Sequence, residues 1–174
     1  TIESSRSKFK LQSLPPNEFP LFEATAEETS FVVKQNLLGA LFQKTQFAMA
    51  QKEFRINLNR LLLETSPNTL TSVGTDGHRL ARSVSIVDKS KLTEASFIVP
   101  RKAIQEAQRI LDDGGEAKIT FTDNQATFNL NNVKLITKLI DGSFPDYGRV
   151  IPKETSINIL IKSDNIKPSL QRVS

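Results

Sequence analysis

Acid–base chemistry is the first possibility that the sequence raises, because its only histidine, His78, stands two residues after Asp76. A carboxylate that orients an imidazole can make it a general base, as in a metal-independent hydrolase. Such an enzyme also needs a nucleophile or second catalytic group, and the chain has no cysteine, serine elbow, second histidine or phosphate-binding loop. The hydrolase is therefore held as an alternative. The simpler interpretation is a β-hairpin turn at Asp76-Gly77, where glycine supplies the positive φ.

A second acidic cluster, Asp112, Asp113 and Glu116, could hold a cation. Its neighbours Gly114 and Gly115 are residues that end helices, so we interpret the cluster as a solvated helix end. Without cysteine the chain has no disulfide and no thiolate metal ligand, which fits a reducing compartment. We expect neither a metal nor a cofactor.

The charge balance of the sequence bears on the kind of partner that the protein binds. The 23 lysines and arginines exceed the 19 aspartates and glutamates, for a net charge of +4 and a pI near 9.4. A basic balance favours a polyanionic partner, with nucleic acid among the candidates. No stretch reaches the roughly 18 apolar residues of a membrane span, and no charged-then-apolar leader is present. We expect a soluble, cytoplasmic protein.

Two amphipathic helices are predicted from apolar residues at helical spacing. We expect the first over residues 34–50 and the second over residues 101–112, where two aspartates and two glycines end it. The apolar positions of the first are Leu37, Leu38, Leu41, Phe42, Thr45 and Ala48. Those of the second are Ala103, Ile104, Ala107, Ile110 and Leu111.

The other regular segments are predicted to be strands, several of them with alternating apolar and polar residues. They cover residues 31–33, 55–65, 69–75, 78–87 and 97–99, and a three-strand meander over 117–122, 126–130 and 133–139. Nothing alternates strand and helix in the order of a doubly wound nucleotide-binding fold. We therefore predict an α+β fold with two helices packed on one face of antiparallel sheets.

Segments near the two ends of the chain resemble segments in its middle. Residues 8–14 align with residues 133–139, and residues 31–45 align with residues 160–174. The two matches agree in order and spacing, which predicts tandem repeated domains in a longer protein. Repeated proteins are more often scaffolds, rings or arrays than single-pocket enzymes.

The repeat also predicts domain boundaries. We expect the tail of one domain over residues 1–24, a complete domain over residues 25–150, and the beginning of the next domain over residues 151–174. Residues 15–30, which hold Pro15-Pro16 and several acidic residues, are predicted to be the linker between the first two.

Two strings carry a resemblance to a known family. They are Gly74-Thr75-Asp76-Gly77-His78-Arg79-Leu80-Ala81 and Asp141-Gly142-Ser143-Phe144-Pro145-Asp146-Tyr147-Gly148-Arg149-Val150. In them the chain closely resembles the beta subunit of bacterial DNA polymerase III, the sliding clamp of chromosome replication. Shorter matches support it at residues 46–50, 58–59, 98–102 and 138–142. The resemblance covers the whole chain: the end of domain one, all of domain two and the beginning of domain three.

The resemblance implies a protein-binding cleft. In the family an apolar pocket takes a short linear motif, with a glutamine and a terminal Leu-Phe pair, from replicative polymerases, the clamp loader and repair proteins. The corresponding residues here are Leu58, Thr75, Gly77, His78, Arg79, Leu80, Pro145, Arg149 and Val150. Their chemistry suits the role, because leucine, proline and valine supply apolar surface and the arginines can reach backbone carbonyls. One residue departs from the family pattern: Arg60 stands where glycine is usual, which bears on the strand path near Leu58.

The resemblance also implies that the helices face duplex DNA inside a ring. The basic residues expected on that face are Lys44, Lys52, Arg101, Lys102 and Arg109. Arg101 and Lys102 lie in the first turn of the second helix, where positive charge opposes the helix dipole, so stability alone does not explain them. Phosphate contacts of this kind carry no base-sequence information, as a sliding ring requires.

The function expected from the resemblance is non-enzymatic. It is a processivity factor that encircles duplex DNA as a homodimeric ring and tethers the DNA polymerase III catalytic subunit, the clamp loader and repair proteins. A nucleic-acid-binding module that forms no ring is the other alternative.

Overall fold

The computed structural model describes residues 1–18, 29–51, 58–87 and 92–173. The chain divides into two units, Thr1–Gly142 and Ser143–Ser174. The N-terminal segment holds a small antiparallel hairpin, β1 (Ile2–Ser4) and β2 (Ser7–Phe9), followed by the 3-10 turn η1 (Pro16–Glu18).

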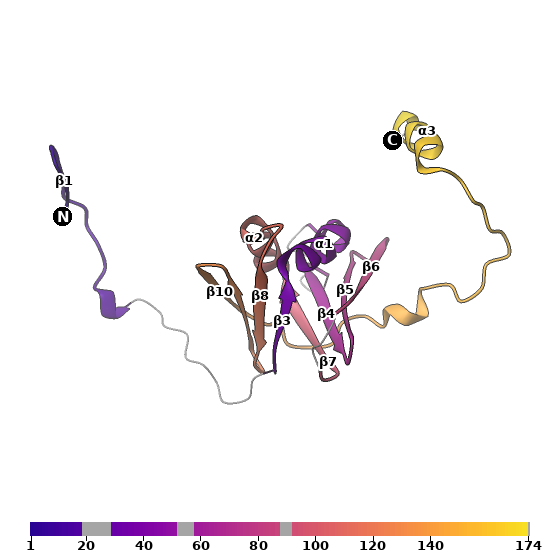
Figure 1. Ribbon diagram of the computed structural model, residues 1–174, viewed down its shortest axis with the longest axis horizontal. Helices are drawn as coiled ribbons and strands as arrows, with labels where there is room; N and C mark the ends of the chain where they lie inside the picture. Colours follow the sequence, from indigo (N-terminus) through magenta and orange to yellow (C-terminus); the bar gives the residue numbers. More distant parts are fainter. Residues whose placement is uncertain (19–28, 52–57, 88–91, 174) are drawn as a thin grey trace. The chain divides into compact units, whose positions relative to one another are not determined.

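Two four-stranded antiparallel sheets form the body of the first unit (Figure 1). One has the order β10-β9-β8-β3, and its strands are Val133–Lys138, Gln125–Leu130, Glu116–Phe121 and Thr29–Lys34. The other has the order β6-β5-β4-β7, with strands Leu80–Ile86, Thr69–Thr75, Arg60–Ser66 and Ala95–Pro100. The predicted meander is confirmed as β8, β9 and β10. Buried residues alternate with more exposed ones along β8 and β9, whereas β10 has no buried residue.

Two helices lie on the same side of this body (Figure 1). They are α1 (Gln35–Thr45), which is followed by the 3-10 turn η2 (Gln46–Ala48), and α2 (Arg101–Ile110). The fully buried Gln35 connects the start of α1 to the end of α2 and to the meander: its Nε2 donates to Asn131 Oδ1 (2.8 Å), and its Oε1 accepts from the backbone N–H of Asp112 (2.9 Å). An α+β fold with antiparallel sheets and helices is thus confirmed.

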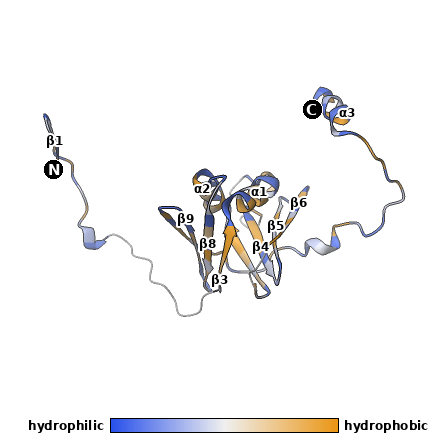
Figure 2. Cartoon of the chain, in the orientation of Figure 1, coloured by the Kyte–Doolittle hydropathy of each residue, from blue (hydrophilic) through white to orange (hydrophobic). Residues whose placement is uncertain are grey.

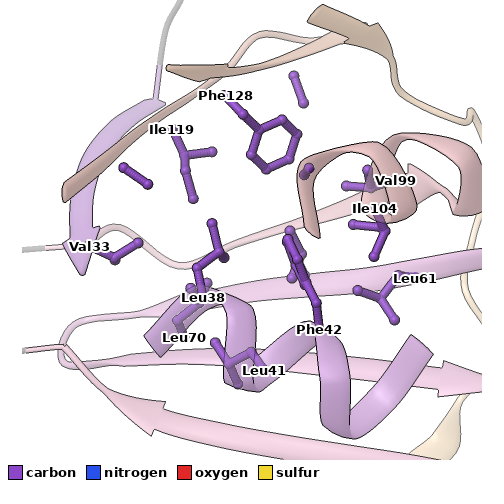
Figure 3. Packing of buried hydrophobic residues seen from close by; sticks show 14 of the residues in the cluster. Val33, Leu38, Leu41, Phe42, Leu61, Leu70, Val99, Ile104, Ile119 and Phe128 are labelled. Atoms are coloured by element: carbon purple, nitrogen blue, oxygen red, sulfur yellow. The ribbon is translucent and has the colours of Figure 1, made fainter. Parts of the chain in front are cut away.

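One hydrophobic core joins the helices to both sheets (Figure 3). Phe121 of β8 stacks on Phe97 of β7 at 3.7 Å between ring centroids, and Phe42 of α1 meets Phe128 of β9 edge-on at 6.5 Å. The apolar colouring is strong on strands of both sheets, such as β3 and β4 (Figure 2). Because both helices and strands of both sheets contribute to the same core, the position of one fixes the position of its neighbours.

Several predicted boundaries need correction. The first helix ends at Thr45, because Thr45 has φ −128°, and the second ends at Ile110, because Leu111 is extended with ψ 134°. The strand predicted from residue 78 begins at Leu80, since His78 and Arg79 belong to the turn. The strand predicted over residues 55–65 is found from Arg60, and residues 55–57 lie outside the described residues.

The second unit contains the 3-10 turn η4 (Tyr147–Arg149) and the helix α3 (Ser163–Val173), and neither buries a residue. Pro168 lies inside α3, which carries apolar residues such as Ile166 and Leu170 in exposed positions. Among the helices of the described residues, none is long and apolar enough to cross a membrane.

Candidate functional site

The turn between β5 and β6 is held together by its own side chains. Asp76 Oδ1 accepts from the backbone N–H groups of His78 (2.9 Å) and Arg79 (3.0 Å), and Asp76 Oδ2 accepts from Arg79 Nε (3.0 Å). Thr75 Oγ1 accepts from the Gly77 N–H (3.1 Å) and donates to the Arg79 carbonyl (2.8 Å). Gly77 has φ +87°, so the Asp-Gly turn uses glycine as predicted. The outcome is an exposed turn of defined shape.

These hydrogen bonds also define what Asp76 does. The backbone N–H groups of His78 and then Arg79, followed by the Arg79 side chain, hold the pKa of the Asp76 carboxyl below its ordinary value. The carboxylate is therefore charged at neutral pH and braces the turn. This role differs from the orientation of an imidazole that the hydrolase alternative requires.

No metal cluster occurs in the part of the chain that the structure describes: no three histidines, aspartates or glutamates there are grouped for one. Asp112 Oδ2 accepts from Asn131 Nδ2 (3.1 Å), and the Asp112 backbone N–H donates to Gln35 Oε1 (2.9 Å). Asp112 thus connects the segment after α2 to the β9–β10 turn.

The turn is docked on the end of α1. A Cβ atom added to Gly74 would lie 2.5 Å from the carbonyl oxygen of Thr45, so only glycine fits this approach of two backbones. Two residues before Gly74 on the same strand, the Ser72 hydroxyl lies 2.7 Å from the Thr45 hydroxyl. Thr45 Oγ1 also donates to the Leu41 carbonyl at 2.8 Å. The α1–η2 junction therefore fixes the strand that leads into the turn.

The predicted cleft residues of the first unit lie at one end of the sheet. Leu61 pairs with Gly74, so Leu58, three residues before Leu61, is placed at the same end as the turn. Thr75 is buried, Leu58 and Leu80 are half-buried, and the other three predicted residues of the turn, Gly77, His78 and Arg79, are exposed. The structure thus brings together an apolar and a polar part of the predicted wall.

The other predicted cleft residues belong to the second unit. Pro145, Arg149 and Val150 are exposed, and Arg149 Nε lies 2.8 Å from Oδ2 of Asp146, the residue that precedes the turn η4. Arg60, the departure from the family pattern, is buried and its pKa is lowered by burial. It does not interrupt β4, because it pairs in register with Pro100 of β7.

The predicted basic residues have different surroundings. Lys44 and Lys102 are exposed, and Arg109 is exposed with its Nη1 3.0 Å from both Glu106 carboxylate oxygens. Arg101 Nη1 donates to the Met49 and Ala50 carbonyls, each at 3.1 Å, so it also holds the segment after η2. Lys52 lies outside the described residues.

A shallow polar hollow of about 250 Å³ lies between η2 and α2, close to these basic residues. It is lined by Gln46, Gln105, Gln108 and Arg109. Gln108 Oε1 is buried there and has no hydrogen-bond partner among the described residues. The surface beside Arg109 thus offers amide groups as well as positive charge.

Phe47 has no role in the expectations drawn from the sequence, and the structure places it beside the turn. Its side chain is 55% exposed, and Arg79 Cζ lies 5.9 Å from the centroid of its ring. Its exposure was visible in principle, because Phe47 lies off the apolar stripe of the first predicted helix. Its contact with a residue 32 positions further along the chain was not.

Comparison with known proteins identifies the family. Residues 32–146 match the family described as the DNA polymerase III beta subunit, central domain. The beta sliding clamps of Proteus mirabilis and Escherichia coli strain K12 are 37% and 36% identical to the chain, over 99% of this chain and 47% of each relative. The crystal structure of the DNA polymerase III subunit beta from Pseudomonas aeruginosa is similar with a TM-score of 0.81 and 39% identity, over 87% of this chain and 42% of that chain.

These matches confirm the resemblance drawn from the two strings. The chain spans about half the length of the curated relatives it matches. Sliding clamps are a non-enzymatic family, which agrees with an Asp76 that is bound to the backbone of its own turn. The match to the central-domain family covers well over half of the chain, and the chain therefore belongs to the DNA polymerase III beta subunit family, the sliding clamps.

Proposed function

We propose that this chain is the central part of a DNA sliding clamp, a processivity factor that encircles duplex DNA and tethers replication proteins. The observation that carries the proposal is the braced turn of Thr75 to Leu80, which presents His78 and Arg79 to solvent beside the half-buried Leu80. An exposed surface of fixed shape with apolar and polar parts is suited to a short peptide, because the protein loses little conformational entropy on binding.

The proposed partner site includes residues besides those of this turn. Leu58 adds apolar surface at the same end of the sheet, and Pro145, Arg149 and Val150 of the second unit would complete the wall. The proposed ligands are linear motifs with a glutamine and a terminal Leu-Phe pair. We assign them to the DNA polymerase III catalytic subunit, the clamp loader and repair proteins.

The proposed DNA surface is the polar side of the two helices. Lys44, Lys102 and Arg109 are exposed there. The proposed set also includes Arg101 and Lys52, of which Lys52 lies outside the described residues. Duplex DNA would be bound through its phosphates, independently of base sequence. The polar hollow beside Arg109 fits the same surface, because amide groups can bind phosphate oxygens directly or through water.

The proposed whole is a ring of repeated domains. Residues 1–24 would be the tail of domain one, residues 25–150 domain two and residues 151–174 the beginning of domain three. Two copies of the full-length protein would close into a homodimeric ring in the cytoplasm. The share of the relatives that this chain covers is consistent with such a division.

The test is a titration of the ¹⁵N-labelled chain with a peptide that carries the Gln and Leu-Phe motif. Chemical-shift changes should cluster at Leu58, residues 75–80 and residues 145–150. We expect weak affinity, near millimolar, because the rest of the wall would come from domain three. A matched peptide with Ala-Ala in place of Leu-Phe should cause no such changes. Shifts elsewhere, or none at millimolar peptide, would contradict the proposal, and a nucleic-acid-binding module without a ring would bind DNA but not this peptide.

A further inference from the structure

The ring of Phe47 lies against the guanidinium of Arg79, a residue of the proposed partner site. Arg79 Cζ is 5.9 Å from the ring centroid, within the range of a cation–π contact. Phe47 is 55% exposed and does not belong to the hydrophobic core, so packing of the core does not account for its position. An exposed phenylalanine alone would need no explanation, but this one covers a named binding residue.

The guanidinium of Arg79 is held in two directions. Its Nε donates to Asp76 Oδ2 at 3.0 Å, which restrains the edge of the group, and the Phe47 ring approaches its Cζ. The arginine side chain is still 53% exposed, so it can meet a ligand while both restraints remain in place. A long side chain that is ordered in advance loses less entropy when a partner binds.

The segment that carries Phe47 is itself firmly anchored. The next two residues, Ala48 and Met49, are fully buried, and Arg101 Nη1 donates to the Met49 carbonyl. On the other side, Thr45 touches Gly74 and Ser72 of β5. The ring therefore stands on a backbone that is fixed relative to the turn.

We propose that Phe47 is a positioning residue for the partner site: its ring orders Arg79, so that the guanidinium meets an incoming peptide already in place. This inference rests on the proposed function, because it takes Arg79 to be part of the peptide-binding wall. Phe47 acts through Arg79, and no contact between Phe47 and the peptide is required.

The ring contact can be tested without any ligand. In the NMR spectrum of the 174-residue chain, the Arg79 Nε–H and side-chain protons should show ring-current shifts. Phe47→Leu should remove these shifts, and Phe47→Tyr should retain them, because tyrosine keeps the π face. Phe9→Leu is the matched control, since Phe9 is equally exposed, at 57%, and lies in the separate N-terminal hairpin.

The positioning role is tested by the dissociation constant of the Gln and Leu-Phe peptide. Phe47→Leu should raise Kd about threefold to tenfold, which corresponds to the ordering of one long side chain. Phe47→Tyr and Phe9→Leu should leave Kd within about twofold, and replacing Phe47 with increasingly fluorinated phenylalanines should weaken binding in graded steps at an unchanged melting temperature.

The outcomes separate the two proposals. If the unsubstituted chain binds no peptide at millimolar concentration, the proposed function is wrong and the positioning role falls with it. If the chain binds but Phe47→Leu leaves Kd unchanged, or Phe47→Tyr weakens binding as much as Phe47→Leu, the positioning role alone is wrong.

Discussion

Asp76 shows how a single side chain determines the form of an exposed surface. Its carboxylate accepts two backbone N–H groups and one guanidinium N–H, so its pKa lies below the ordinary value. A group with a lowered folded-state pKa stabilises the fold above its ordinary pKa, and this contribution is lost as the pH falls through the folded-state pKa. The stability of the turn should therefore depend on pH in the acid range.

The corresponding prediction compares Asp76→Ala with the unsubstituted chain by urea unfolding at several pH values. The variant should be less stable at neutral pH, and the difference should shrink below about pH 4. Asp113→Ala, at an exposed aspartate with no hydrogen bond described for it, should change stability little at any pH. A difference for Asp76→Ala that stays constant from neutral to acid pH would contradict the bracing role of the charge.

Leu80 is half-buried next to the turn, where it would supply apolar wall of the proposed partner site. Leu80→Ala should weaken binding of the Gln and Leu-Phe peptide by roughly 1–3 kcal/mol through lost apolar contact, and Pro145→Ala should have an effect in the same range. Ile86→Ala is the control, because Ile86 is 73% exposed at the other end of the same strand. Calorimetry or NMR titration measures the effect, and equal losses for Ile86 and Leu80 would contradict the assigned wall.

At the scale of elements, the junction of α1 with β5 positions the turn. Gly74→Ala would place a methyl group 2.5 Å from the Thr45 carbonyl oxygen, a backbone atom, so we expect a loss of about 1–3 kcal/mol in unfolding free energy. Gly39→Ala is the matched control, because its methyl group would meet only Leu111 Cδ1 at 3.9 Å and alanine favours the helix by about 1 kcal/mol. If thermal or urea unfolding gave both variants the same stability, the close approach would have no structural role.

The helices should carry the contact with DNA. Replacing Lys44, Lys52, Lys102 and Arg109 together by glutamate in the full-length protein should impair its loading and sliding on DNA and leave peptide binding intact. The weak association of the unsubstituted protein with DNA should fall steeply with salt, because each phosphate contact releases about one counterion.

A control for net charge is available on the sheet of β3, β8 and β10. Its exposed lysines Lys34, Lys118, Lys134 and Lys138 can be replaced by glutamate in the same way. This variant changes the charge by the same amount, and only Lys34, the N-cap residue of α1, adjoins a helix, so the variant should retain most of the sliding activity. Equal effects of the two variants would show that total charge, rather than the helix surface, governs DNA binding.

Sequence patterns predicted those elements that depend on neighbours along the chain. The meander, the Asp-Gly turn and the existence of both helices follow from local alternation, turn chemistry and helical spacing. The pairing of β3 with β8 and of β4 with β7 did not follow, because it joins residues that are distant in sequence. Helix ends were predicted too late, since Thr45 and Leu111 leave the helix to make contacts that only the folded core determines.

At the scale of the whole molecule, local features of the candidate site were also predicted from the sequence, and contacts between distant residues were not. The two strings predicted the family, which the comparisons confirm. The hairpin turn was predicted at Asp76-Gly77, whereas the observed turn also includes His78 and Arg79. The contact between Phe47 and Arg79 and the approach of Gly74 to Thr45 could not be predicted, because they depend on how α1 packs on β5. The roles of Pro145, Arg149 and Val150 stay predictions for the complete clamp.

The most direct test of the account is topological. In this test the clamp loader loads the full-length protein that carries this domain onto nicked circular DNA. Gel filtration then measures how much protein stays on the DNA at salt concentrations that abolish simple phosphate contacts. A ring that encircles the duplex should stay on the closed circle and leave within minutes after the circle is cut to a linear form. Equal retention on circular and linear DNA, or loss from both at high salt, would contradict the proposed sliding clamp.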